Sequence, residues 1–93
     1  MRTPITLDRR RDTPLHRQVY EEWRRGILAG RFAAGDRMPS TRELAEALGV
    51  ARATVASAYD QLVAEGYLEG HHGSGTFVSQ DLPERGVLQV PEP

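Results

Sequence analysis

Two arginines, Arg42 and Arg52, stand in the first turns of two short predicted helices. A positive charge at that end opposes the helix macrodipole, so this placement carries a cost that a binding role would explain. An arginine fork can donate two parallel hydrogen bonds to O6 and N7 of guanine, which a lysine ammonium cannot do. The pattern therefore indicates a base contact at Arg52, whereas Arg42 taken alone fits an ordinary surface residue equally well.

Small and hydroxylated side chains follow Arg52. The outer face of its helix is predicted to carry Ala53, Ala56 and Ser57, with Thr54 near the edge. Small residues let a helix lie close to the floor of a DNA groove, and alanine methyls can contact thymine methyls. Helix propensity alone also accounts for the two alanines, so both interpretations stay open.

Ser40 and Thr41 stand where the other short helix begins. Ser40 and Glu43 form a capping box, in which each side chain accepts a hydrogen bond from the backbone N–H of the other residue. The remaining free N–H groups at such a helix start can bind phosphate. Capping alone explains Ser40, so phosphate contact by Ser40 and Thr41 is a second, separate expectation.

A glycine-tipped hairpin is predicted after the helices. Tyr67–Glu69 and Thr76–Val78 have the composition of short strands and flank a turn. Glycine at the tip permits positive φ and a close backbone approach to a groove, which makes His72, Gly73 and Ser74 candidate contacts. A plain hairpin turn is the alternative. Adjacent histidines on a strand point to opposite sides, so no metal site is expected.

Three helices must position these residues. In the first, apolar side chains recur at every fourth position, at Leu15, Val19, Trp23 and Ile27. This spacing predicts an amphipathic helix that ends near Gly30. Thr13 is the expected N-cap, and Pro14 is expected at the first helical position, where its missing N–H costs nothing.

The second helix is predicted from Thr41 to about Ala47, and the third from Arg52 to Glu65. The break Gly49–Ala51 between them is short, which brings the two helices together at a steep angle. The expected fold class is mainly α with a small β-hairpin, namely a winged helix-turn-helix with three helices plus a wing. Its boundaries are an N-terminal arm over 1–12, the DNA-binding domain over 13–79, and a linker over 80–93 toward an absent effector-binding domain.

Composition narrows the class of protein further. The chain of 93 residues has no cysteine, which excludes a disulfide framework and a thiolate zinc site. No segment has the length and hydrophobicity of a signal peptide or a membrane span, so we expect a cytoplasmic protein. The net charge is −1 and all 12 basic residues are arginines, which predicts weak nonspecific binding to nucleic acid.

Three segments resemble, in order and spacing, the DNA-binding domain of the GntR family of bacterial transcription regulators. They are Pro39–Arg42, Ala58–Leu62 and Gly73–Val78. The resemblance extends from about Thr13 to Ser79 and is closest to the MocR-like (PdxR-like) branch of that family.

The resemblance implies specific contacts with DNA. It assigns base and phosphate contacts to Arg42, Arg52 and Thr54, and minor-groove contacts to His72 and Gly73. Two residues depart from the family pattern. Ala51 stands where a hydroxyl cap is usual, which costs about 0.5–2 kcal/mol, and Ala56 stands where several branches have an arginine.

The function expected from these observations is sequence-specific DNA binding in a bacterial transcription regulator, with the recognition helix in the major groove and the wing in the minor groove. The alternative is a winged-helix module for protein–protein interaction without DNA binding, which the net charge of −1 keeps open. We find no catalytic constellation, so the chain is not expected to be an enzyme.

Partners and cofactors follow from the same resemblance. The expected partner is a double-stranded DNA operator, with a homodimer formed only through the absent domain or on DNA, and no membrane. MocR-like proteins continue into a domain resembling aminotransferases that binds pyridoxal phosphate. This chain has no lysine for a Schiff base, so no cofactor is expected in it, and pyridoxal phosphate would belong to the absent C-terminal domain.

Overall fold

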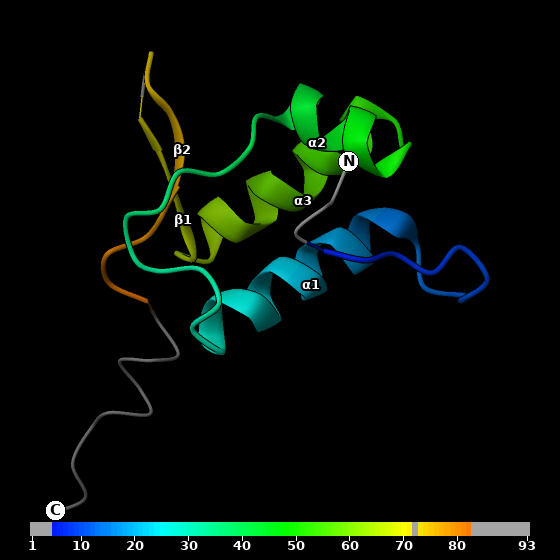
Figure 1. The fold of residues 1–93 in the computed structure, drawn as a ribbon, viewed down its shortest axis with the longest axis horizontal. Helices are drawn as coiled ribbons and strands as arrows, with labels where there is room; N and C mark the ends of the chain where they lie inside the picture. Colours follow the sequence, from blue (N-terminus) through cyan, green and yellow to red (C-terminus); the bar gives the residue numbers. More distant parts are fainter. Residues whose placement is uncertain (1–4, 72, 83–93) are drawn as a thin grey trace, which may run out of the picture.

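The computed structural model describes residues 5–71 and 73–82. The elements are three helices followed by one antiparallel hairpin: α1 (Leu15–Leu28), α2 (Thr41–Leu48), α3 (Arg52–Ala64), β1 (Leu68–His71) and β2 (Gly75–Val78). The helices lie together on one side and the hairpin stands beside them (Figure 1). The predicted class, mainly α with a small hairpin in a winged helix-turn-helix, is confirmed.

The core lies where α3 crosses α1 and contacts α2 and β1. From α1 it takes Val19, Trp23 and Ile27, each at most 1% exposed, as the four-residue spacing predicted. From α3 it takes the face that carries Val55 and Leu62, both of which are fully buried. Burying a side chain of this size stabilises the fold by about 1.5–3 kcal/mol, so the orientation of α3 is fixed by its buried face.

The start of α1 differs from the prediction. Pro14 itself occupies the N-cap position, with φ −56° and ψ 149°, and no side chain caps the helix. The predicted cap, Thr13, instead offers its carbonyl oxygen to Nε2 of Gln18 at 2.8 Å. Gln18 is buried, so its amide needs hydrogen-bond partners. It finds them on residues 8–13, which it thereby holds against the start of α1.

Both ends of α2 have caps that its sequence contains. Oγ of Ser40 accepts from N of Glu43 at 3.0 Å, and Oε1 of Glu43 accepts from N of Ser40 at 2.9 Å, so the capping box is confirmed. Gly49 ends α2 in the left-handed region with φ 70°. A residue with a side chain is strained there, which explains why the turn requires glycine.

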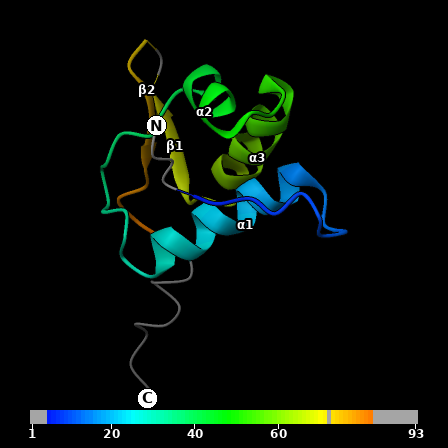
Figure 2. The same ribbon diagram turned by 45° about the vertical axis from the view of Figure 1, so that its right-hand side comes forward.

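Residues 36–38, which precede α2, pair with the outer edge of β2. The sequence did not predict this pairing. N of Met38 donates to O of Thr76 at 2.8 Å, and N of Val78 donates to O of Asp36 at the same distance. Between these bonds Arg37 forms an antiparallel bridge with Phe77. This segment runs alongside β2 and leads directly to α2 (Figure 2), so it ties the hairpin to the start of that helix.

Residues from both flanks of the range 13–79 also join the core. Ile5 is 3% exposed and Leu82 is 5% exposed, and both belong to the same apolar cluster. The N-terminal segment is held by Gln18, whose Oε1 accepts from N of Asp8 at 2.8 Å and whose Nε2 donates to O of Asp8 at 2.9 Å. Residues 1–4 of the predicted arm and 83–93 of the predicted linker lie outside the described residues.

Candidate nucleic-acid interface

The first turns of α2 and α3 are brought together by the short turn between them. Nε of Arg52 donates to Oγ1 of Thr41 at 3.4 Å. In the part of the chain that the structure describes, this is the guanidinium's one hydrogen bond, which leaves both terminal amino groups available. Arg52 is exposed. Its fork is thus held from one side and open on the other, as bidentate binding of a base edge requires.

The rest of the outer face of α3 is small and accessible. Ala53 and Ser57 are exposed, while Thr54 and Ala56 are half-buried, in agreement with the face that helical periodicity predicted. No bulky side chain of α3 stands between this face and solvent near its N-terminal end. The helix can therefore approach a groove closely, with the hydroxyls of Thr54 and Ser57 as further donors or acceptors.

Tyr59 fixes α3 relative to the start of α2. Its hydroxyl donates to O of Pro39 at 2.7 Å, and its ring is buried in the core. Burial raises the pKa of this phenol well above its usual value, and the charge of Glu43 raises it further. The hydroxyl therefore stays protonated and keeps donating to Pro39 even above about pH 10, and the bond ties α3 to the residue that precedes the cap of α2.

The first turn of α2 carries the other candidate residues on the helical side. Ser40 is exposed although its hydroxyl is used for capping, and Thr41 is half-buried beneath Arg52. Nε of Arg42 lies 3.6 Å from Oε2 of Glu46, and both side chains are more than 70% exposed. An ion pair this exposed is worth little, so Arg42 can exchange Glu46 for a phosphate or a base at small cost.

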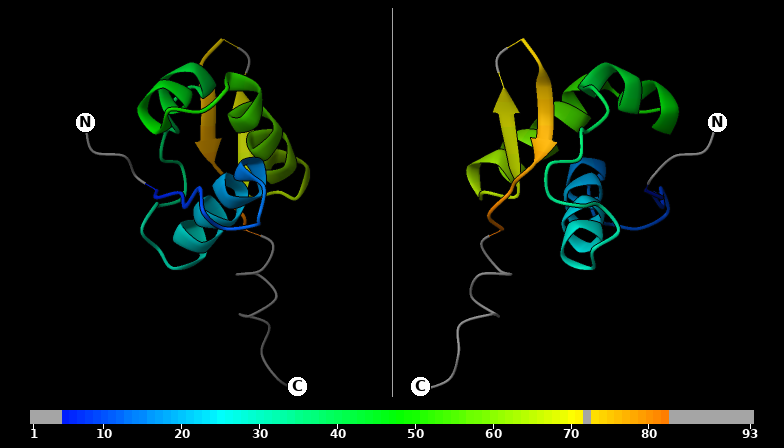
Figure 3. Two further views of the ribbon diagram at one scale, coloured as in Figure 1. Left: turned by 90° about the vertical axis from the view of Figure 1, so that its right-hand side faces the viewer. Right: turned by 60° about the vertical axis from the view of Figure 1, so that its left-hand side comes forward.

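The tip of the wing lies at the same end of the molecule as the start of α2 (Figure 3). Gly73 and Ser74 are exposed at this tip, where Gly73 has φ 79° and N of Ser74 donates to O of His71 at 2.9 Å. His72, the third predicted wing contact, lies outside the described residues. The structure therefore brings the described candidates of α2 and the wing to one end.

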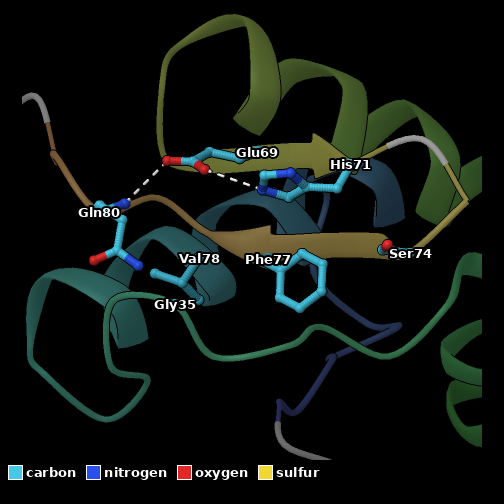
Figure 4. Close-up of a pocket in the computed structure, with 7 residues that line it drawn as sticks. All are labelled: Gly35, Glu69, His71, Ser74, Phe77, Val78 and Gln80. Atoms are coloured by element: carbon cyan, nitrogen blue, oxygen red, sulfur yellow. Dashed lines mark hydrogen bonds and ion pairs between the residues drawn. The ribbon is translucent and has the colours of Figure 1, made fainter.

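The outer face of the hairpin is held together by polar contacts around a shallow open hollow (Figure 4). Oε2 of Glu69 accepts from N of Gln80 at 3.0 Å, and Oε1 lies 3.2 Å from Nε2 of His71. The His71 ring stands edge-on to Phe77 at 5.1 Å between centroids. These groups satisfy one another, so they stiffen the base of the wing.

Two arginines near this end were missed by the sequence analysis. Nη2 of Arg9 donates to O of Gly49 at 2.5 Å and to O of Leu48 at 3.4 Å, at the end of α2. Arg37 lies beside the wing at Gly75. Arg9 is distant in sequence from Gly49, and Arg37 is distant from Gly75 although it lies close before Ser40. The one available signal was that most arginines of the chain lie in its N-terminal half.

Comparison with known sequences gives a consistent match. The profile described as "Bacterial regulatory proteins, gntR family" matches residues 15–78. A Rhizobium meliloti protein described as "Probable rhizopine catabolism regulatory protein MocR" is 54% identical over 80 residues, which are 86% of this chain and 16% of that protein. In Corynebacterium glutamicum, the "HTH-type pyridoxine biosynthesis transcriptional regulator PdxR" is 44% identical over 79 residues, 85% of this chain and 17% of that protein.

The chain thus spans about a sixth of the length of these curated relatives. Among solved structures, that of the AraR DNA-binding domain in complex with an operator superposes with a TM-score of 0.69 and 32% identity, covering 83% of this chain and 94% of that one. Within residues 5–71 and 73–82, no helix has the length and hydrophobicity needed to cross a membrane. The same residues contain no group of three or more histidine or carboxylate side chains suited to a metal ion.

Proposed function

This chain belongs to the gntR family of bacterial regulatory proteins, as a DNA-binding domain of its MocR-like branch, and we propose that it recognises one operator sequence through Arg52. The observation that carries the proposal is the guanidinium of Arg52, held at Nε by Thr41 and open at both terminal amino groups. An arginine presented in this way is pre-organised for two hydrogen bonds to one guanine.

In this proposal α3 enters the major groove with its N-terminal end first. Arg52 binds O6 and N7 of a guanine, and Thr54 and Ser57 contact neighbouring base edges or phosphates. Ala53 and Ala56 let the helix lie close enough for these bonds, and their methyl groups can pack on thymine methyls. The exposure of Ala53 and Ser57 and the partial exposure of Thr54 and Ala56 support this arrangement.

The start of α2 and the wing grip the DNA on either side of α3. Ser40 and Thr41 accompany a helix N-terminus, where backbone N–H groups favour a phosphate, and Arg42 adds a positive charge. We assign His72, Gly73 and Ser74 to the minor groove. Support for this assignment comes from the wing tip, which lies at the same end of the molecule as α2 (Figure 3).

The whole regulator is proposed to be larger than this chain. Residues 13–79 form the DNA-binding module, with an arm over 1–12 and a linker over 80–93 toward an effector-binding domain. This chain contains no lysine, so it cannot form a Schiff base, and pyridoxal phosphate is assigned to that separate domain. Dimerisation is likewise assigned to that domain or to binding on DNA. We place the regulator in the bacterial cytoplasm, where its operator is accessible.

The test is selection of duplexes from a randomised pool, followed by binding measurements at one salt concentration. The proposal predicts enrichment of a common motif and binding at least about 10³-fold tighter than to random duplex, as specific recognition requires. A domain that serves only protein–protein interaction would enrich no motif. The same measurements on Arg52→Ala test the role of Arg52. Their matched control is Arg25→Ala, because Arg25 pairs with Glu22 on α1 at 2.7 Å and carries the same charge as Arg52.

A further inference from the structure

The hairpin has no permanent positive charge of its own. From Tyr67 to Ser79 its sequence contains neither arginine nor lysine, and it contains one carboxylate, Glu69. DNA phosphates and a narrow minor groove present a strong negative potential. A wing that lies against them would bind more tightly if another part of the chain placed a positively charged side chain beside it.

Arg37 is the residue that the fold brings to the wing. Its antiparallel bridge with Phe77 and the bond from N of Met38 to O of Thr76 make it part of the sheet edge. Side chains alternate along such an edge. Met38 is 4% exposed and points into the core, so Arg37 points to the opposite, outer face, where it is exposed.

The side chain of Arg37 extends along the sheet toward the wing tip. A Cβ on Gly75 would lie 3.4 Å from Nε and 3.6 Å from Nη2 of Arg37. The guanidinium thus covers Gly75, two residues from the exposed Gly73. Gly75 has φ 112°, a backbone conformation that favours glycine.

The charge of Arg37 also affects Glu43 in the first turn of α2. Hydrogen bonds from Ser40 hold the pKa of Glu43 below its usual value, and the charge of Arg37 lowers it further. Yet within residues 5–71 and 73–82 no carboxylate lies within ion-pair distance of Arg37. The guanidinium therefore lies beside the wing at Gly75 with its hydrogen-bonding capacity available.

We propose that Arg37 binds a backbone phosphate of the DNA strand that separates the groove holding α3 from the groove holding the wing. The inference rests on the proposed DNA-binding function. The contact is to phosphate and not to a base, because Arg37 stands behind the wing tip at the sheet edge, where it meets the rim of the groove before its floor. A phosphate contact adds affinity equally on all sequences.

The experiment compares Arg37→Ala with Arg31→Ala. Arg31 follows α1, is exposed, and lies 5.6 Å over the ring of Phe32, so each change removes one positive charge from an exposed side chain. Affinities for the selected operator and for random duplex are measured across a salt series, after thermal melts confirm that both variants are folded.

We expect Arg37→Ala to weaken binding to operator and to random duplex by the same factor, about 5- to 10-fold near 0.1 M salt. The slope of log affinity against log salt concentration should fall in magnitude by about one. Arg37→Lys should restore most of the slope, since a phosphate accepts a point charge. Arg31→Ala should have the same affinities and the same salt slope as the parent.

Two results would overturn the inference. If Arg37→Ala and Arg31→Ala have the same affinity and salt slope, Arg37 does not touch the DNA. If Arg37→Ala changes the ratio of operator to random binding, Arg37 reads bases and the phosphate assignment is wrong. A parent domain that selects no operator would instead refute the proposed function itself, so the two failures are distinguishable.

Discussion

Replacing Arg52 with alanine separates sequence recognition from general attraction to DNA. The side chain is exposed, and its hydrogen bond to Thr41 is long at 3.4 Å. Such a surface bond contributes little to folding, so the melting temperature should stay within a few degrees of the parent. Any large loss of affinity can then be assigned to the interface.

The magnitude follows from the contact that is lost. A bidentate arginine–guanine pair contributes about 1–3 kcal/mol of discrimination, which corresponds to roughly 5- to 150-fold weaker operator binding. A random duplex has no guanine at a fixed position, so affinity for it should fall only by the effect of removing one positive charge. Fluorescence anisotropy with both duplexes at the same salt concentration gives the two affinities.

Two further variants sharpen this experiment. Arg52→Lys should recover little operator affinity, because an ammonium lacks the planar fork. Thr41→Val removes the oxygen that holds Nε while keeping the shape of the side chain, and it should cause a smaller loss than Arg52→Ala. The reasoning is refuted if Arg52→Ala leaves the ratio of operator to random affinity at the parental value.

The remaining predictions concern stability, measured by denaturant or thermal unfolding. Gln18→Ala removes the three hydrogen bonds by which the buried Gln18 amide ties Asp8 and Thr13 to α1 and should cost about 1–3 kcal/mol; an unchanged unfolding midpoint would contradict this. Gly49→Ala places a side chain at φ 70° and should cost about 1–2 kcal/mol, whereas a stabilised variant would show that the turn adapts. Burial, followed by the hydrogen bond to Glu65, raises the pKa of Tyr20 to about 12, so its contribution to stability is complete below pH 10 and is lost as pH rises toward 12. Tyr20→Phe should therefore show a smaller loss over that interval than the parent, and equal losses would exclude Tyr20 as a cause.

Local signals in the sequence predicted most of the elements. The spacing of Val19, Trp23 and Ile27 located α1, and the pair Ser40 and Glu43 located the start of α2. Each signal acts through neighbours within one or two helical turns. The outer face of α3 could likewise be predicted, because residues that are not buried at helical spacing must face outward.

Contacts between distant residues could not be predicted in this way. Thr13 does not cap α1: its hydroxyl accepts from Nη2 of Arg11 and its carbonyl oxygen from the buried amide of Gln18, which also binds Asp8. The pairing of Arg37 with Phe77 and the reach of Arg9 to Gly49 join residues 40 positions apart in sequence. Neither leaves a local pattern, since polar side chains on an edge or a loop show no periodicity.

The most direct test of the central claim is an NMR titration of the isotopically labelled domain with its selected operator. The account predicts amide shift changes concentrated at residues 40–42, 52–57 and 72–75. The exposed side of α1, around Arg17 and Glu21, should remain unchanged, since these residues form an ion pair at 3.1 Å away from the proposed interface. Shift changes centred on α1, or none at the start of α3, would contradict recognition of DNA by this end of the molecule.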